Sequence, residues 1–216
     1  NKILMMIGEL YCLYQKHPNV ITDSRLANEG GIFFALKGDR FDANDFVEKA
    51  LEDGAHYAVS DRKSYLGNEK VFVVDDVLKT LQQLAVFHRR HIKIPVLAIT
   101  GTNGKTTTKE LIAHAVSQKY KVLYTQGNLN NHIGVPLTIL KISSEHKIAI
   151  IEMGANHPGE IKALCEIAEP DYGIITNVGR AHLEGFGSFE GVKKTKGELY
   201  DFIAEFGKGI FINAGN

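Results

Sequence analysis

The feature that most constrains the fold of this chain is a glycine-containing loop at residues 101–107, Gly-Thr-Asn-Gly-Lys-Thr-Thr. An apolar run at 96–100 precedes the loop, and apolar residues recur at helical spacing over 105–118. Strand, loop and helix in this order can bind phosphate, because glycines let backbone N–H groups turn toward phosphate oxygens at the helix N-terminus. The sequence therefore predicts a nucleoside triphosphate site.

The residues expected to contact the triphosphate are Gly101, Thr102, Asn103, Gly104, Lys105, Thr106 and Thr107. Lys105 has the reach to contact the β- and γ-phosphates, and the hydroxyl of Thr106 can ligate Mg²⁺. The loop is shorter than the common phosphate-loop pattern, since Ile99 stands where that pattern has its first glycine. The alternative is a glycine-rich turn that binds nothing, and the complete order of strand, loop and helix argues against it.

The chain divides by pattern into residues 1–92 and 93–216. In the first part we expect an amphipathic stretch at 3–14, helices at 44–53 and 76–91, and short strands between them. The last helix ends in His88-Arg89-Arg90-His91. Such a run can be an anion site, but basic residues at a helix C-terminus more often form a solvated end that the helix dipole favours.

In the second part, apolar strands alternate with helices, which is typical of a parallel sheet covered on both faces. The predicted strands are 96–100, 121–124, 148–151, 172–176 and 209–212, and the predicted helices are 105–118, 135–140, 158–168 and 189–205. The fold class is therefore α/β, with a small N-terminal domain followed by a P-loop parallel-sheet domain. No helix follows the strand at 209–212, so we expect this chain to be a truncated piece of a longer protein.

Composition excludes several classes of partner. Lys plus Arg number 25 and Asp plus Glu number 25, so no net charge attracts nucleic acid or an anionic membrane. No apolar run approaches the roughly 20 residues that cross a bilayer. Cys12 and Cys165 both fall in predicted helices, which argues against a disulfide framework and favours a reducing compartment such as the cytoplasm.

Two further residues lie where they can bring charge to the same sheet edge. Glu152 directly follows the apolar strand 148–151, and open α/β sheets bind ligands at the carboxyl ends of their strands. His182 lies in the glycine-containing loop after 172–176. Each side chain could instead be solvated, but beside a phosphate loop a carboxylate completes the coordination of Mg²⁺.

Lys196 lies on the inward stripe of the predicted helix 189–205, whereas Lys193 and Lys194 point away from it. A lysine on an inward stripe must extend its amine to the surface, pair with a carboxylate, or lose its charge. Helical spacing alone leaves these possibilities open.

The short loop at 101–107 resembles that of the Mur ligases and their folylpolyglutamate synthase relatives, and the resemblance to the Mur ligases extends over essentially the whole chain. It implies ATP and two Mg²⁺ sites, with Thr106 and Glu152 at one and His182 and Lys196 at the other. The matching lysine of several Mur ligases is carbamylated, so a carbamylated Lys196 is implied here. The catalytic residues are then expected to be Lys105, His182 and Lys196.

Within this family, the stretches 125–136, 152–161 and 181–188 resemble the branch that adds D-alanyl-D-alanine to UDP-N-acetylmuramoyl-tripeptide. The first stretch is rich in amides and hydroxyls, and it is expected to bind substrate through Asn128, Asn130 and Asn131. A polar loop with an asparagine-stabilised turn is the alternative.

The N-terminal segments 22–25 and 33–44 resemble those that hold the UDP end of the substrate. Arg25 and Lys37 offer cations to a diphosphate, and Ser24 offers a hydroxyl. Ordinary surface loops are the alternative. The resemblance makes 1–92 a UDP-substrate-binding domain and 93–216 an incomplete ATP-binding domain without its C-terminal neighbour.

The implied reaction is an ATP-driven amide ligation through an acyl phosphate, in peptidoglycan precursor synthesis in the bacterial cytoplasm. We expect the chain alone to bind the UDP substrate but to turn over slowly or not at all. Two alternatives stay open. One is the sibling ligase that adds the third, diamino residue, and the other is a non-catalytic nucleotide-binding module, although such a module would not need Glu152, His182 and Lys196 together.

Overall fold

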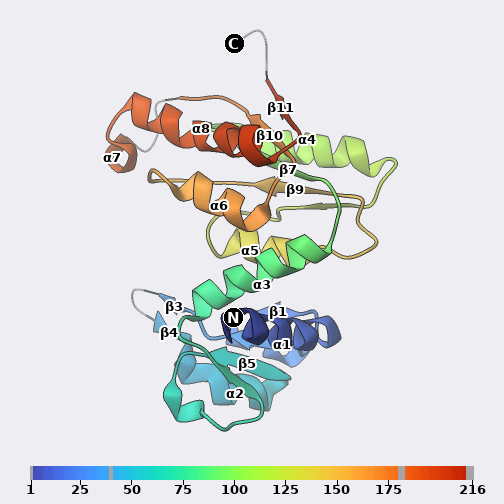
Figure 1. Ribbon diagram of the computed structural model, residues 1–216, viewed down its shortest axis with the longest axis vertical. Helices are drawn as coiled ribbons and strands as arrows, with labels where there is room; N and C mark the ends of the chain where they lie inside the picture. The colour runs from blue at the N-terminus through green and yellow to red at the C-terminus, as the bar shows by residue number, and fades with distance from the viewer. Residues whose placement is uncertain (1, 39–40, 180–182, 213–216) are drawn as a thin grey trace. The chain divides into compact units, whose positions relative to one another are not determined.

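The computed structural model describes residues 2–38, 41–179 and 183–212. The chain divides into two compact units, Asn1–Phe87 and His88–Asn216, which are called the first and second unit below (Figure 1). The division falls inside helix α3 (Val77–His91). This helix confirms the one predicted at 76–91. Within the described ranges, no helix is both long and apolar enough to cross a membrane.

In the described part of the first unit, four parallel strands form a sheet in the order β1-β2-β5-β6. These strands are β1 (Val20–Ile21), β2 (Ile32–Phe34), β5 (Tyr57–Ser60) and β6 (Val71–Val73). A separate antiparallel pair consists of β3 (Lys37–Gly38) and β4 (Phe41–Asp42). The helical elements are α1 (Lys2–Lys16), α2 (Val47–Asp53), the first part of α3, and 3-10 turns at Ser24–Glu29 (η1), Ala43–Phe46 (η2) and Lys63–Tyr65 (η3).

Both faces of this first sheet are buried at its centre. Phe33 packs with Val47 and Ala50 of α2 in one apolar cluster. Ile32 and Phe34 alternate to the opposite face, and both are fully buried. Burial on both faces explains why the strand is a continuous apolar run rather than an alternating one.

In the second unit, the described strands form a five-stranded parallel sheet in the order β11-β10-β7-β9-β8. The strands are β7 (Val96–Thr100), β8 (Val122–Tyr124), β9 (Ile148–Glu152), β10 (Tyr172–Ile175) and β11 (Gly209–Phe211). The helices are α4 (Lys105–Ser117), α5 (Gly134–Ile139), α6 (Glu160–Ala168), α7 (Leu183–Phe186) and α8 (Phe189–Phe206). The predicted parallel α/β class is confirmed.

Helices cover both faces of the second sheet. Ala113 of α4 packs against Leu97 and Ile99 on one face. On the other face, Gly173 of β10 lies so close to Leu199 and Ile203 of α8 that a Cβ there would come within 3.2 Å of both side chains. Helix α6 packs beside α8 and α5 (Figure 1).

Strand order places a ligand crevice at the carboxyl end of β7. From β7 the chain passes through α4 to β8, whereas from β9 it passes through α6 to β10 on the other side of β7. The connections that leave β7 and β9 therefore diverge to opposite faces of the sheet. Such a switch point is where open α/β sheets bind ligands.

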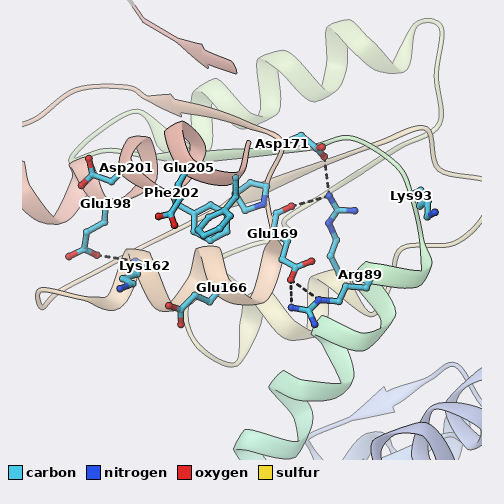
Figure 2. Close-up of a pocket in the computed structure, with 13 residues that line it drawn as sticks. Arg89, Lys93, Lys162, Glu166, Glu169, Asp171, Glu198, Asp201, Phe202 and Glu205 are labelled. Carbon is cyan, nitrogen blue, oxygen red and sulfur yellow. Dashed lines mark hydrogen bonds and ion pairs between the residues drawn. The ribbon is translucent and has the colours of Figure 1, made fainter. Parts of the chain in front are cut away.

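The end of α3 corrects one prediction. The side chain of Arg89 is not solvated, because it donates hydrogen bonds to the carbonyl oxygens of Ala168 (3.0 Å) and Glu169 (2.9 Å) and to the carboxylate of Asp171 (3.0 Å). Figure 2 shows the bond to Asp171. His88 is also buried, and its Nε2 donates to the carbonyl of Ile142 at 2.8 Å. Burial lowers the pKa of His88. Only the second half of the basic run, beginning at Arg90, is exposed as a solvated helix end would be.

Candidate functional site

The glycine-containing loop joins β7 to α4 through two glycines in the left-handed half of φ space. Gly101 has φ 145° and Gly104, the residue before α4, has φ 76°. A Cβ on Gly101 would stand 2.0 Å from Oγ1 of Thr176, so the loop requires glycine there for space as well as for φ. This local geometry brings the first turn of α4 to the end of β7.

The loop that follows β10 fixes the position of the phosphate loop. The N–H of Asn103 donates to Oδ1 of Asn177 at 3.0 Å, and Nδ2 of Asn177 donates back to the carbonyl of Asn103 at 3.1 Å. The N–H of Thr102 donates to the carbonyl of Asn177 at 3.0 Å, and Oγ1 of Thr176 donates to that of Asn103 at 2.6 Å. Sequence reasoning missed Thr176 and Asn177 as residues that position the loop. The available signal was that both follow β10, which is the neighbour of β7 in the sheet.

Lys105 lies across the phosphate loop. Its Nζ donates to the carbonyl oxygens of Gly101 (2.9 Å) and Thr102 (3.2 Å). Thr106 and Thr107 are exposed at the start of α4. The lysine amine, the exposed hydroxyls and the first amides of α4 thus lie at the end of β7, where a phosphate loop has these groups, and their contact with ATP stays a prediction.

Glu152 is buried at the carboxyl end of β9, opposite Ile99 of β7 in the strand register. Its N–H donates to Oγ1 of Thr125, and its Oε1 accepts from Nδ2 of Asn130, both at 2.9 Å. Its Oε2 is buried and has no hydrogen-bond partner among the described residues. A hard divalent cation such as Mg²⁺ prefers oxygen ligands, so a buried carboxylate oxygen that accepts no hydrogen bond from the described residues fits the predicted metal.

Lys109 also contacts Glu152, and sequence reasoning missed it. Its side chain is fully buried, and its Nζ lies 3.7 Å from Oε2 of Glu152. It shares a helical stripe with Ile112 and Ala113, so the spacing test that singled out Lys196 could have found it.

Lys196 is buried on the inward stripe of α8, as predicted, whereas Lys193 and Lys194 are exposed. Its amine lies 5.6 Å from the centroid of the Phe186 ring. Burial, and then the positive charge of Lys105, lower the pKa of Lys196 from 10.5 to about 8, although Glu160 and Glu198 oppose this shift. Near neutral pH the uncharged form of this amine is therefore more populated than in an ordinary lysine, and carbamylation needs that uncharged form.

His182, the other predicted metal ligand, lies outside the described residues. In the described ranges, His, Cys, Asp and Glu side chains form no group of three that could hold a metal by itself. Of the predicted metal ligands, Thr106, Glu152 and Lys196 lie within the described residues, and their binding of Mg²⁺ stays a prediction.

The three asparagines of the 125–136 stretch lie in different environments. Asn128 is exposed, whereas the Asn130 side chain donates to Glu152. Oδ1 of Asn131 accepts from the N–H groups of Ile133 (3.1 Å) and Gly134 (2.9 Å) at the start of α5. Their contacts with substrate stay predictions, and two of them also have a structural role.

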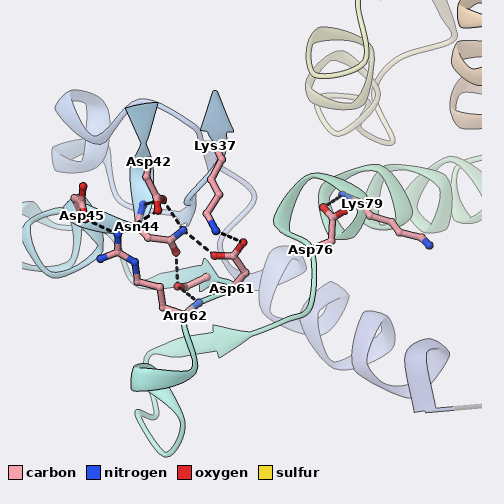
Figure 3. Close-up of polar contacts among 9 residues, drawn as sticks. Lys37, Asp42, Asn44, Asp45, Asp61, Arg62, Asp76 and Lys79 are labelled. Atoms are coloured by element: carbon pink, nitrogen blue, oxygen red, sulfur yellow. Dashed lines mark hydrogen bonds and ion pairs between the residues drawn. The ribbon is translucent and has the colours of Figure 1, made fainter. Parts of the chain in front are cut away.

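In the first unit, the cations predicted to bind diphosphate are already paired with carboxylates. Lys37 Nζ lies 2.7 Å from Oδ2 of Asp61, and the exposed Arg25 pairs with Asp23 at the start of η1, next to Ser24. Figure 3 shows the Lys37 pair joined to a network centred on the buried Asn44. Their predicted role in substrate binding stays a prediction.

A separate pocket in the second unit lies between α6, α8 and the end of α3 (Figure 2). Acidic and basic side chains line it, among them Lys162, Glu166 and Asp201, together with Phe202. Its lining reaches Lys93 and Asp171, which precede β7 and β10, so it opens at the amino ends of the strands. Among the described residues, none of those predicted for ATP or metal lines it, and the candidate site is therefore at the opposite end of the sheet.

Comparisons with known proteins agree with this geometry. Residues 99–216 match the family described as the Mur ligase middle domain. The UDP-N-acetylmuramoyl-tripeptide–D-alanyl-D-alanine ligase of Escherichia coli is 43% identical over 91% of this chain, and that of Bacillus subtilis is 42% identical over 89%. The chain spans 43% of the length of each.

Solved structures give the same result. MurF from Acinetobacter baumannii superimposes with a TM-score of 0.81 at 40% identity, over 88% of this chain and 42% of that one. MurF ligase from Thermotoga maritima in complex with ADP gives 0.81 at 36% identity, over 91% and 46%. The family domain matches more than half of the residues, and the solved structures share the predicted fold. This chain therefore belongs to the Mur ligase family.

Proposed function

We propose that this chain supplies the substrate- and ATP-binding parts of a ligase that joins D-alanyl-D-alanine to UDP-N-acetylmuramoyl-tripeptide. The observation that carries the proposal is the phosphate loop at 101–107 with the buried Glu152 beside it, in a chain whose similar relatives bear that activity in their names. The related 2,6-diaminopimelate ligase is only 24% identical and supports the fold alone. The D-alanyl-D-alanine assignment is therefore better supported than the sibling activity.

The second unit would bind ATP through the amides of the loop and the amine of Lys105. Thr106 and Glu152 would hold one Mg²⁺, and His182 with Lys196 would hold a second. Bound Mg²⁺ would neutralise charge that develops on the transferred phosphoryl group. The residues themselves would then align the γ-phosphate with the attacking carboxylate and exclude water, which are the main tasks of the protein in phosphoryl transfer.

The proposed reaction has two steps. A terminal carboxylate oxygen of the tripeptide attacks the γ-phosphorus of ATP, ADP leaves, and an acyl phosphate forms. The amine of D-alanyl-D-alanine then attacks the acyl carbon, inorganic phosphate leaves with the former carboxylate oxygen, and the new amide nitrogen loses a proton. The positive charge of Lys105 would stabilise the negative charge of the phosphates during the first step.

Lys196 is proposed to act as a carbamate. Its neutral amine attacks the carbon of CO₂, and the nitrogen then loses a proton, which leaves a carboxylate-like group on a formerly basic side chain. The buried position and lowered pKa of the Lys196 amine support this step, because the neutral amine is the nucleophile. The product would carry the negative charge that a second Mg²⁺ requires.

The first unit is proposed to bind the UDP end through Ser24, Arg25 and Lys37, with Asn128, Asn130 and Asn131 at the sugar or peptide. We also propose a bacterial cytoplasmic location. Cys12 and Cys165 are both free thiols, which agrees with a reducing compartment.

Calorimetric titration tests the proposal. The chain is titrated with UDP-N-acetylmuramoyl-tripeptide, with UDP and with ATP plus Mg²⁺. We expect ATP to bind, and the muramoyl-tripeptide to bind more tightly than UDP. Lys105→Met should weaken ATP binding about 100-fold through the lost phosphate contact, while binding of the UDP substrate is retained.

Each other outcome has a clear meaning. ATP binding without any response to the UDP substrate would overturn the ligase proposal in favour of a nucleotide-binding module. Preference for a substrate that lacks the third stem residue would instead favour the sibling ligase.

A further inference from the structure

Lys109 is a buried cation that the proposed reaction does not use. It lies on α4, three residues after Thr106, and its side chain is completely excluded from solvent. Lysine is rarely buried fully without a partner, because desolvation of an ammonium group is costly. The surroundings of Lys109 must therefore compensate its charge.

Two carboxylates and one aromatic ring surround the amine. Nζ lies 3.2 Å from Oε1 of Glu110, 3.7 Å from Oε2 of Glu152 and 5.8 Å from the centroid of the Tyr124 ring. Glu110 is half exposed, so water screens its charge. Glu152 is as buried as Lys109 itself, and a low-dielectric surrounding strengthens the attraction between these two charges.

The pair is incomplete in its hydrogen bonds. Among the described residues, neither Nζ of Lys109 nor Oε2 of Glu152 has a hydrogen-bond partner. The other oxygen of Glu152 is held by Asn130. The Glu152 carboxylate thus has one fixed oxygen and one oxygen whose main compensation is the charge of Lys109.

We propose that Lys109 is a positioning residue that acts through Glu152, as the internal counter-cation that Mg²⁺ must compete with at this carboxylate. The inference rests on the proposed function, in which Glu152 holds Mg²⁺ beside Thr106. Without metal, Lys109 neutralises Glu152 and stabilises the site. With metal, the two cations share one carboxylate and repel each other. Lys109 therefore lowers the affinity for Mg²⁺ and favours release of the metal together with the nucleotide.

Thermodynamic reciprocity makes the proposal measurable. If Lys109 weakens Mg²⁺ binding more in the nucleotide-bound chain than in the free chain, its removal increases the factor by which Mg²⁺ strengthens nucleotide binding. The quantity to measure is the dissociation constant of ADP with EDTA divided by that with Mg²⁺, obtained by calorimetry on the chain. A general loss of nucleotide affinity cancels in this ratio.

In Lys109→Met the ratio should rise about tenfold, because a unit positive charge next to the metal-binding carboxylate is removed. The same substitution in a Glu152→Gln background should leave the ratio unchanged, since the group through which Lys109 acts is already neutral. Lys121→Met removes an exposed lysine from the position just before β8 and is the matched control with an unchanged ratio. In EDTA, Lys109→Met should lower the midpoint of thermal unfolding by about 5 °C.

If Lys109→Met does not fold, Lys109→Gln removes the charge while keeping a hydrogen-bond donor, and the same rise is expected. A ratio that stays constant would show that Lys109 only fills the core, and a ratio that falls would show that it assists the metal. Either result overturns the inference but leaves the proposed function intact. If the unsubstituted chain bound ADP neither with EDTA nor with Mg²⁺, both the inference and the proposed function would be overturned.

Discussion

Asn177, in the loop after β10, and Asn103, in the phosphate loop, are joined by two hydrogen bonds in opposite directions, 3.0 and 3.1 Å long. The side chain of Asn177 therefore matches both the N–H and the C=O of Asn103. Since β10 and β7 are adjacent in the sheet, this contact holds the loop in one conformation before any nucleotide arrives. Preorganisation of this kind reduces the cost of ordering a loop on binding.

Asn177→Leu should weaken ATP binding about tenfold, because both hydrogen bonds to the loop are lost and the free loop samples more conformations. Affinity for ATP with Mg²⁺, measured by calorimetry, checks this. Gln118→Leu removes an exposed amide from the far end of α4 and serves as the control with unchanged affinity. Equal affinity of the Asn177 variant and the unsubstituted chain would show that the contact does not organise the loop.

The lowered pKa of Lys196 predicts that the stability of the chain rises with pH. The pKa of the Lys196 amine in the folded chain is about 8, below its ordinary 10.5. Between pH 8 and pH 10.5, this amine is therefore protonated more in the unfolded chain than in the folded chain. The destabilising contribution of Lys196 is thus complete below pH 8 and disappears as pH rises toward 10.5. Relative to Lys196→Met, the unsubstituted chain should gain on the order of 2 kcal/mol of unfolding free energy between pH 7 and pH 10.

Urea unfolding in CO₂-free buffer measures this difference, with the lysine uncarbamylated. Lys193→Met replaces an exposed lysine of the same helix and should show no such change. A difference between the chain and Lys196→Met that is constant with pH would contradict the buried, pKa-shifted amine.

Arg89 is predicted to be a major stabilising residue of the second unit. Arg89→Met leaves the carbonyl oxygens of Ala168 and Glu169 without this donor and removes one of the partners of the Asp171 carboxylate, and should cost about 3 kcal/mol of unfolding free energy. The neighbouring Arg90 is exposed and pairs only at the surface, so Arg90→Met should cost less than about 1 kcal/mol. Urea denaturation of both variants makes the comparison, and similar costs would contradict the prediction.

Asn44 is predicted to organise the β3–β4 pair. Its buried amide donates to Asp42 (2.7 Å) and Asp61 (2.8 Å), and its Oδ1 accepts from Ser60 (Figure 3). Asn44→Leu leaves the Ser60 hydroxyl without its acceptor and Oδ1 of Asp61 without the Asn44 donor, and should cost about 2–3 kcal/mol. Thermal unfolding of the first unit measures this cost.

Asn68→Leu, at an exposed turn, is the control for Asn44→Leu. If the network also places Lys37, calorimetry should show weaker binding of the UDP substrate to the Asn44 variant. Full stability of that variant would show that water satisfies these groups as well as Asn44 does.

The sequence by itself determined most of the elements and which residues are expected at the site. Apolar periodicity located the described strands of the second unit and its helices α4, α5, α6 and α8, but not the short α7, and the order of strand, glycines, lysine and helix indicated the phosphate loop. These signals are local, because hydrogen bonding and side-chain direction within one element depend on residues a few positions apart. The inward position of Lys196 followed from the same periodicity.

Tertiary structure alone decided which of these elements meet. The contacts of Lys109 with Glu152, of Asn177 with Asn103 and of Arg89 with the Asp171 carboxylate join residues that are 43, 74 and 82 positions apart. They exist because β7 lies between β9 and β10, an order that no local pattern encodes. Strand order is set by how the helices and both faces of the sheet bury apolar surface together, so the partners of a buried charge became known only with the complete fold.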